Sequence, residues 1–312
     1  MMNGLRTLVS ETAQMLGSVL DHNGLWCTPS AGSEAAADLA NAETGPSGPW
    51  GEAPVRDVMD IAWMALGLAG ENARASAVLL GKPIWFSRLP GIRSFGRADP
   101  FALRTSFPVE VLTRSVIEAA SLAFWLTESG LGVRARVARQ IVYRMNGAVR
   151  MEEALDSMGG PRPGEQRRDY GELTDDVRQA AADLGLPLAQ SGRQWDCDGQ
   201  KYPGYLGRAA NLSASFARTP EVPYQVYSGV AHAELWGLWR GYLQLPRNGH
   251  PHDRQQFTFK PLNVHSAVQA LVEAIISAAR RTAGYLGAGA VQAELTKWAS
   301  EADQRLDALR PP

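Results

Sequence analysis

A histidine and a serine stand one helical turn apart in the segment PYQVYSGVAHAELWGLW, which begins at Pro223. Ser228 precedes His232 by four residues, so the two side chains share one helix face. Histidine changes its charge between pH 5 and 8, and as a general base it can accelerate a reaction on the order of 10²–10⁴-fold. We therefore predict that His232 is catalytic and that Tyr227 and Ser228 bind a ligand. A histidine that only packs in the core remains the alternative.

A second polar group lies on the segment PVEVLTRSVIEAASLAFWLTES, where one line of polar residues crosses an otherwise apolar helix. At about 100° per residue, the line consists of Glu110, Arg114, Glu118, Ser121 and Trp125. A helix that is apolar around most of its circumference is usually buried, so the line faces either solvent or an internal polar cleft. In the cleft interpretation, Glu118 is a second catalytic residue and Arg114 binds a ligand.

Arg144 lies on the apolar side of the following helix, which is predicted over residues 133–158. A guanidinium that faces a core needs a carboxylate, because an unpaired buried charge is costly. We predict that Arg144 pairs with Glu118 and lines the same pocket. The alternative is that its aliphatic stem lets the charge reach solvent.

The same helix carries a basic face, which the sequence predicts to be exposed. Arg136, Arg139 and Arg150 share this face with Gln140 and Tyr143. Because no acidic residue appears in this stretch before position 152, a solvated basic stripe is the expected arrangement.

Weaker signals lie in two loops. The sequence from Arg247 to Asp253 holds His250 and His252, but there is no further ligand set near them, so we predict no metal site and no cofactor. Residues 82–107 alternate aromatic and basic side chains, which either bind phosphorylated or nucleic-acid ligands or form a packed lid. No glycine-rich nucleotide-binding loop is present.

Helical periodicity accounts for nearly all of the chain and predicts an all-α bundle of about seven to nine helices. A short strand or hairpin is expected near residues 255–260. We expect an N-terminal helix and connector over residues 1–53 and the main helical bundle over 54–312, together forming one domain. The predicted helices span residues 5–20, 55–80, 108–129, 133–158, from 173 onward, 203–217, 223–243, 264–285 and 288–309.

One helix could also mediate association. Residues 264–285 carry an apolar stripe at alternating spacings of four and three residues, from Val264 to Tyr285. Such a stripe forms either the core of a bundle or the seam of a homodimer. Both interpretations remain open at the level of sequence.

Composition excludes several broad classes. The formal net charge is −1, so there is no general attraction to nucleic acid or anionic membranes. Cys27 and Cys197 are the only cysteines and are far apart in the chain, which favours a reducing compartment over a disulfide scaffold. No segment resembles a signal peptide or a membrane-spanning helix. We expect a cytoplasmic protein that does not associate with membranes.

Two short motifs resemble those of a known group. RSVIEAASLAFWL, beginning at Arg114, and YSGVAH, ending at His232, are similar to an Arg-x3-Glu helix and a Tyr-Ser-x3-His helix found in uncharacterised bacterial all-helical proteins near the HEPN-type bundles. The resemblance covers about residues 108–245. Several HEPN proteins are ribonucleases or toxin components, so it implies action on RNA. The Arg-x4–6-His motif of HEPN ribonucleases has a counterpart here only in Arg247 to His252, within a Pro/Gly loop.

Three functional hypotheses follow. The first is a polar pocket that binds a small anionic molecule, with His232 and Glu118 available for acid–base chemistry. The second is an HEPN-like component that acts on RNA or in a toxin or defence system. The third is a dimeric interaction protein without catalytic activity.

Overall fold

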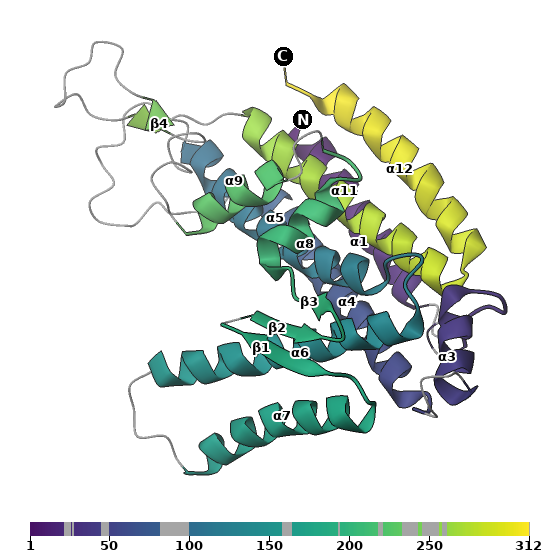
Figure 1. Cartoon of the computed structure of the whole chain (residues 1–312). Helices are drawn as coiled ribbons and strands as arrows, with labels where there is room; N and C mark the ends of the chain where they lie inside the picture. Colours follow the sequence, from purple (N-terminus) through teal and green to yellow (C-terminus); the bar gives the residue numbers. More distant parts are fainter. Residues whose placement is uncertain are drawn as a thin grey trace.

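A computed structural model of the chain confirms the all-α class (Figure 1). It describes residues 1–21, 26, 28–44, 50–81, 100–157, 164–192, 194–217, 221–232, 243–244, 256–257 and 261–311. These residues form ten helices, slightly more than the seven to nine predicted, together with one three-stranded and one two-stranded sheet.

The core is a bundle of long helices that lie side by side. Helix α5 (Pro100–Leu126) packs against α4 (Ala53–Gly81) and α11 (Pro261–Leu286). Helix α1 (Met2–Leu20) packs against α4 and α11, and α12 (Gly289–Leu309) covers the outer side of α11 (Figure 1). The N-terminal helix is thus packed into the main bundle, while the division at residue 53 stays a prediction.

The apolar stripe of α11 forms part of this core. Each member of the stripe is buried within the single chain: Val264, Val268, Leu271, Ile275, Ala278, Thr282 and Tyr285. Other helices of the same chain cover this stripe, as expected for the core of a bundle. A homodimer through residues 264–285 stays a prediction.

A smaller layer lies on the opposite side of the bundle from α12 (Figure 1). It contains α6 (Val133–Ser157), α7 (Gly164–Asp183) and an antiparallel sheet. The strands of the sheet are β1 (Leu188–Ser191), β2 (Gln194–Cys197) and β3 (Gln200–Lys201).

The tight turn between β2 and β3 explains why this sheet forms. Asp198 and Gly199 both have positive φ angles, of 50° and 78°, which is typical of a two-residue type I′ hairpin. The sheet is fastened to α6 because Arg134 Nε donates to Asp198 Oδ2 at 2.6 Å. In β2, burial raises the pKa of the Cys197 thiol to about 12, so this free cysteine stays protonated.

Shorter helices complete the fold. Helix α3 (Glu34–Thr44) lies in the predicted connector, and α8 (Gly204–Ser213) and α9 (Glu221–Ala231) pack on α5. The predicted strand near residues 255–260 is confirmed, because β5 (Gln256–Phe257) pairs antiparallel with β4 (Leu243–Gln244).

Two helix starts differ from the prediction. Helix α5 begins at Pro100, so Pro108 lies inside the helix and not in its first turn. Proline has no backbone N–H and is usually found at helix starts, which explains the error. Helix α7 begins at Gly164, well before the predicted start at Leu173. No helix within the described ranges is both long and apolar enough to cross a membrane.

Candidate functional site

The polar line on α5 lies inside the molecule. Glu110, Ser121 and Trp125 are buried, and Arg114 and Glu118 expose only 20% and 24% of their side chains. The line is therefore not an exposed charge ladder. Its partly exposed members meet a different helix, α9.

Three of the predicted site residues and Tyr224 form one connected cluster between α5 and α9. Arg114 Nε donates to Glu118 Oε1 at 2.8 Å, and Arg114 Nη1 lies 2.8 Å from His232 Nε2. The Tyr224 hydroxyl donates to the same Glu118 oxygen at 2.8 Å. We call these four residues the Arg114 cluster.

The charges of the Arg114 cluster are mutually compensated. Burial opposes the charge of Arg114, but the hydrogen bond and negative charge of Glu118 outweigh it and raise the pKa of the guanidinium. Burial and the contact with Glu118 raise the pKa of Tyr224 to about 12, so its hydroxyl stays a donor. Because arginine has only donors, a hydrogen bond between the two side chains requires Nε2 of His232 to be the acceptor.

The other residues that were predicted to bind a ligand do not join this cluster. Arg144 does not pair with Glu118, because its Nη1 lies 3.5 Å from Asp57 Oδ2 on α4. The prediction of that pair is wrong. Arg144 exposes 35% of its side chain, so its long stem carries the charge outward toward an exposed carboxylate.

Tyr227 and Ser228 also lie outside the Arg114 cluster. Tyr227 is buried, and its pKa is raised by burial and by the charges of Glu110 and Glu273. Within the described residues Ser228 contacts His232 through the backbone only, where the His232 N–H donates to the Ser228 carbonyl at 3.0 Å. The shared helix face of Ser228 and His232 therefore gives no side-chain hydrogen bond between them within the described residues. Catalytic roles for His232 and Glu118 stay predictions.

Some predictions fall on parts of the chain that the structure does not describe. These include the stretch from Arg247 to Asp253, with His250 and His252, and residues 82–99 of the aromatic and basic segment 82–107, whose last eight residues belong to α5. Among the described residues, no group of three or more His, Cys, Asp or Glu side chains is arranged to hold a metal ion.

Of the five residues on the predicted basic face of α6, only Arg150 is exposed, so most of this face is not solvated as predicted. Arg136 is only 1% exposed, Gln140 is buried, and Arg139 exposes only 12% of its side chain. Arg139 Nη1 is held by Glu128 Oε2 at 2.5 Å and by the Trp125 carbonyl at 2.7 Å. The cause of the error is that this face packs against acidic and carbonyl groups from distant parts of the chain.

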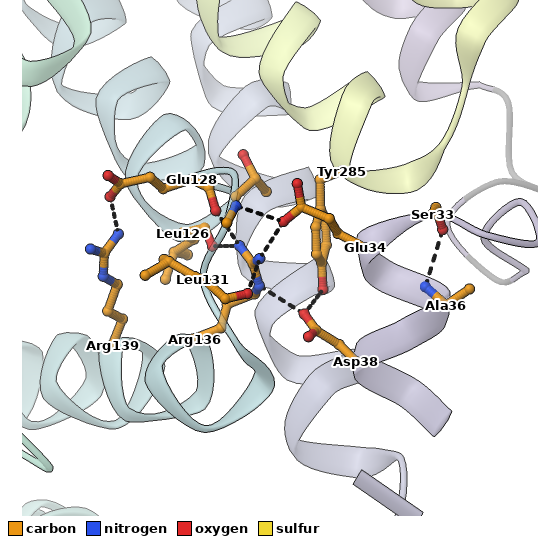
Figure 2. A network of polar contacts seen from close by, with 12 residues as sticks. Ser33, Glu34, Ala36, Asp38, Leu126, Glu128, Leu131, Arg136, Arg139 and Tyr285 are labelled. Atoms are coloured by element: carbon orange, nitrogen blue, oxygen red, sulfur yellow. Dashed lines mark hydrogen bonds and ion pairs between the residues drawn. The ribbon is translucent and has the colours of Figure 1, made fainter. Parts of the chain in front are cut away.

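Arg136 is the centre of a closed network between α3, α6, α11 and the end of α5 (Figure 2). Nε donates to Asp38 Oδ2 at 2.8 Å, and Nη2 donates to Glu34 Oε2 at 3.0 Å. Its remaining donors bind three backbone carbonyls at 2.9–3.0 Å, those of Leu126, Glu128 and Leu131. A guanidinium has five N–H donors, so every one of them has an acceptor.

Aromatic packing closes this network. The guanidinium of Arg136 lies 4.3 Å from the ring centroid of Tyr285, whose hydroxyl donates to Asp38 at 3.1 Å. Burial raises the pKa of Asp38, although the charge of Arg136 opposes this. The sequence contains a signal for the Arg136–Asp38 ion pair. Asp38 lies between Ala35 and Ala42 on the buried face of α3, and a buried carboxylate requires a cation.

A cleft of about 580 Å³ adjoins the Arg136 network. Glu34 and Tyr285 belong to both, while the rest of the wall comes from α5, α11, α12 and the segments that follow α5 and α8. Its other lining residues are Phe124, Thr127, Ser129, Ser215, Ser277, Arg280, Arg281, Gly284 and Gln292. This volume is typical of sites for small metabolites. We call it the α5–α11 cleft.

Two arginines give the α5–α11 cleft its charge. Arg281 lies over the ring of Phe124, 3.8 Å from the centroid, and burial lowers its pKa, although Glu128 and Glu34 act in the opposite direction. Arg280 is exposed. Among the described residues neither guanidinium has an ion-pair or hydrogen-bond partner, whereas Glu34 is already bound by Arg136.

Comparisons with known proteins add no relative. No protein-family model matches the chain, and neither a curated protein nor a solved structure matches it. The resemblance to HEPN-type bundles therefore stays a prediction, as does action on RNA.

Proposed function

We propose that this protein binds a small anionic molecule in the α5–α11 cleft. The observation that supports this most strongly is the pair Arg280 and Arg281, two cations on the wall of a metabolite-sized cleft without a carboxylate partner among the described residues. The proposal keeps the predicted ligand class and moves the site away from the Arg114 cluster, whose charges already compensate one another.

Arg281 is the stronger anchor for such a ligand. Its guanidinium carbon lies 3.8 Å from the ring centroid of Phe124, and partial burial makes a charge without an ion-pair partner among the described residues costly. An anion at its free N–H groups would remove that cost. Hydrogen bonds to charged groups contribute about 1.5–3 kcal/mol each, which is roughly a ten- to hundredfold effect on a dissociation constant.

Hydroxyl groups on the cleft wall favour a ligand with a polar body. Ser215 Oγ donates to Ser277 Oγ at 3.0 Å, and Ser129 lies nearby on the cleft wall. One face of Phe124 is covered by Arg281, so that face is not free to stack on a planar base. A hydroxylated acid or sugar phosphate suits this wall better than a nucleotide.

Calorimetric titration with ribose 5-phosphate and with citrate tests this proposal. We expect at least one of them to bind, and the double variant Arg280→Gln/Arg281→Gln to weaken its binding about tenfold or more. Arg178→Gln on α7 is the matched control, because it removes one exposed positive charge far from the cleft and should change binding less than about twofold.

Two outcomes contradict the proposal. The first is that neither probe binds the wild-type chain. The second is that the double variant binds a probe as tightly as the wild type does. Equal weakening by Arg178→Gln would indicate that any observed binding depends only on net charge.

A further inference from the structure

Arg208 on α8 is a buried cation whose Nε and Nη1 have no acceptor among the described residues. The residue is only 2% exposed. No carboxylate among the described residues forms an ion pair with it. Buried polar groups in folded proteins are nearly always paired, so this guanidinium requires an explanation.

Aromatic rings surround this side chain. The guanidinium carbon lies 5.0 Å from the ring centroid of Tyr202 and 5.3 Å from that of Tyr205. Tyr143 of α6 packs against Tyr202 with ring centroids 6.3 Å apart, and Arg150 lies over Tyr205 at 5.3 Å. We call these five residues the Arg208 cluster.

The tyrosines of the Arg208 cluster add hydroxyl donors and no negative charge. Burial raises the pKa of both Tyr143 and Tyr202, although Arg208 opposes this, so these hydroxyls stay protonated. Within the described part of the chain none of the three tyrosine hydroxyls has a hydrogen-bond partner. The cluster therefore combines two cations and three hydroxyls with no described carboxylate.

We propose that the Arg208 cluster binds an oxyanion, the phosphate or carboxylate group of a small ligand, with Arg208 as its main donor. This site is distinct from the α5–α11 cleft, because it is built from α6, α8 and the residue after β3. Tyr143 and Tyr205 are only half-buried and Arg150 is exposed, so the rim of the cluster reaches the surface. An oxyanion that enters from this rim would supply the acceptor that Arg208 lacks.

A purely structural role makes a different prediction. Cation–π contacts with two tyrosine rings stabilise an arginine even without an anion. In that case Arg208→Met would remove a favourable interaction and lower the melting temperature. If the site is an empty oxyanion site, replacing an unpaired buried charge by an apolar side chain of similar length is neutral or stabilising in an anion-poor buffer.

The test measures thermal unfolding and calorimetric binding of the full chain with sodium phosphate or sodium acetate, each against sodium chloride at equal ionic strength. We expect one of the two oxyanions to raise the melting temperature of the wild type by roughly 2–4 °C beyond chloride. The phosphate and acetate arms show which oxyanion chemistry the site prefers. Arg208→Met should match or exceed the wild-type melting temperature in chloride and weaken oxyanion binding about tenfold or more.

Controls separate this site from the α5–α11 cleft. The loss of oxyanion binding caused by Arg208→Met should be the same in the Arg280→Gln/Arg281→Gln background, whatever the outcome for ribose 5-phosphate or citrate. If Arg208→Met does not fold, Tyr205→Phe provides the second test, because it removes one hydroxyl at the rim and should weaken oxyanion binding several-fold. The proposal is overturned if neither oxyanion acts beyond chloride, or if the foldable variant responds as the wild type does.

Discussion

Arg136 and Arg208 are the two largest fully buried side chains of the described chain, and their surroundings are opposite. Arg136 has an acceptor for each of its five donors, including the carboxylates of Asp38 and Glu34. Within the described residues, Arg208 has no acceptor at Nε or Nη1, and its guanidinium lies near two tyrosine rings. The two arginines are thus equally buried, but all the donors of Arg136 are paired within the described chain and those of Arg208 are not.

The difference shows what each region of the fold can do. At Arg136, the end of α5 supplies carbonyls and α3 supplies carboxylates, so the guanidinium joins three segments of the chain and has no capacity left for a ligand. At Arg208, the neighbouring groups are themselves donors or cations. A buried arginine therefore indicates a structural role where the chain itself supplies acceptors for all of its donors. It indicates a binding role where the chain does not supply them.

Removing Arg136 should give the largest effect. We expect Arg136→Met to lower the free energy of unfolding by roughly 3–5 kcal/mol, because Asp38 would be left as an uncompensated buried carboxylate. Urea unfolding followed by circular dichroism measures this change. A loss below about 1 kcal/mol would mean that the closed network does not contribute as its geometry indicates.

Glu273, a carboxyl group with no cation partner among the described residues, extends the comparison to the opposite charge. Burial raises the pKa of Glu273 on α11 to about 7, with a further increase from Asp303 and a partial decrease from the hydrogen bond of Gln269. Since the unfolded carboxyl titrates near 4.5, the folded state retains the proton to higher pH. Stability should therefore fall as the pH rises from about 4.5 to 7.

The variant Glu273→Gln tests this account, because glutamine keeps the acceptor for Gln269 and removes the charge. At pH 8 we expect the variant to be more stable than the wild type by roughly 1–3 kcal/mol, after allowing for partial exposure. Below pH 4.5 the difference should disappear. A variant that is less stable than the wild type at pH 8 would contradict the raised pKa.

The smallest expected effect compares two tyrosine hydroxyls. Tyr285→Phe removes the hydrogen bond to Asp38 in the closed network and should cost about 1 kcal/mol of unfolding free energy. Tyr202→Phe in the Arg208 cluster removes a hydroxyl without a described partner and should change the wild type by less than about 0.5 kcal/mol in chloride. Denaturant unfolding of both variants in one buffer gives the comparison, and equal losses would argue against an open cluster.

Periodicity predicted most of the fold because long helices bury one face at a fixed spacing. The apolar stripe from Val264 to Tyr285 is buried as a core stripe should be, and α1, α4 and α12 lie within a few residues of their predicted ranges. The three-stranded sheet was missed because its strands are too short for an alternating pattern. Its one local signal is the Asp198-Gly199 pair, a favoured hairpin turn.

Site geometry was only partly predictable for a related reason. The four-residue spacing of Arg114 and Glu118 predicted their contact within one helix. His232 was predicted to line the same pocket, and it contacts Arg114. Arg136 could not be placed from its own helix, because Asp38 lies almost a hundred residues earlier in the chain. Which face of a charged helix is buried depends on such distant partners, and only the folded chain shows them.

The most direct test of the contrast between the two arginines is NMR of the chain labelled with ¹⁵N-arginine, followed at the Nε–Hε signals during titration with the oxyanion that binds. The Arg208 signal is assigned by its loss in Arg208→Met, and the Arg136 signal by its loss in Arg136→Met. We predict that the Arg208 signal shifts and its proton exchanges more slowly with water, while the Arg136 signal does not move. An Arg208 signal that stays unchanged at saturating oxyanion would contradict the account.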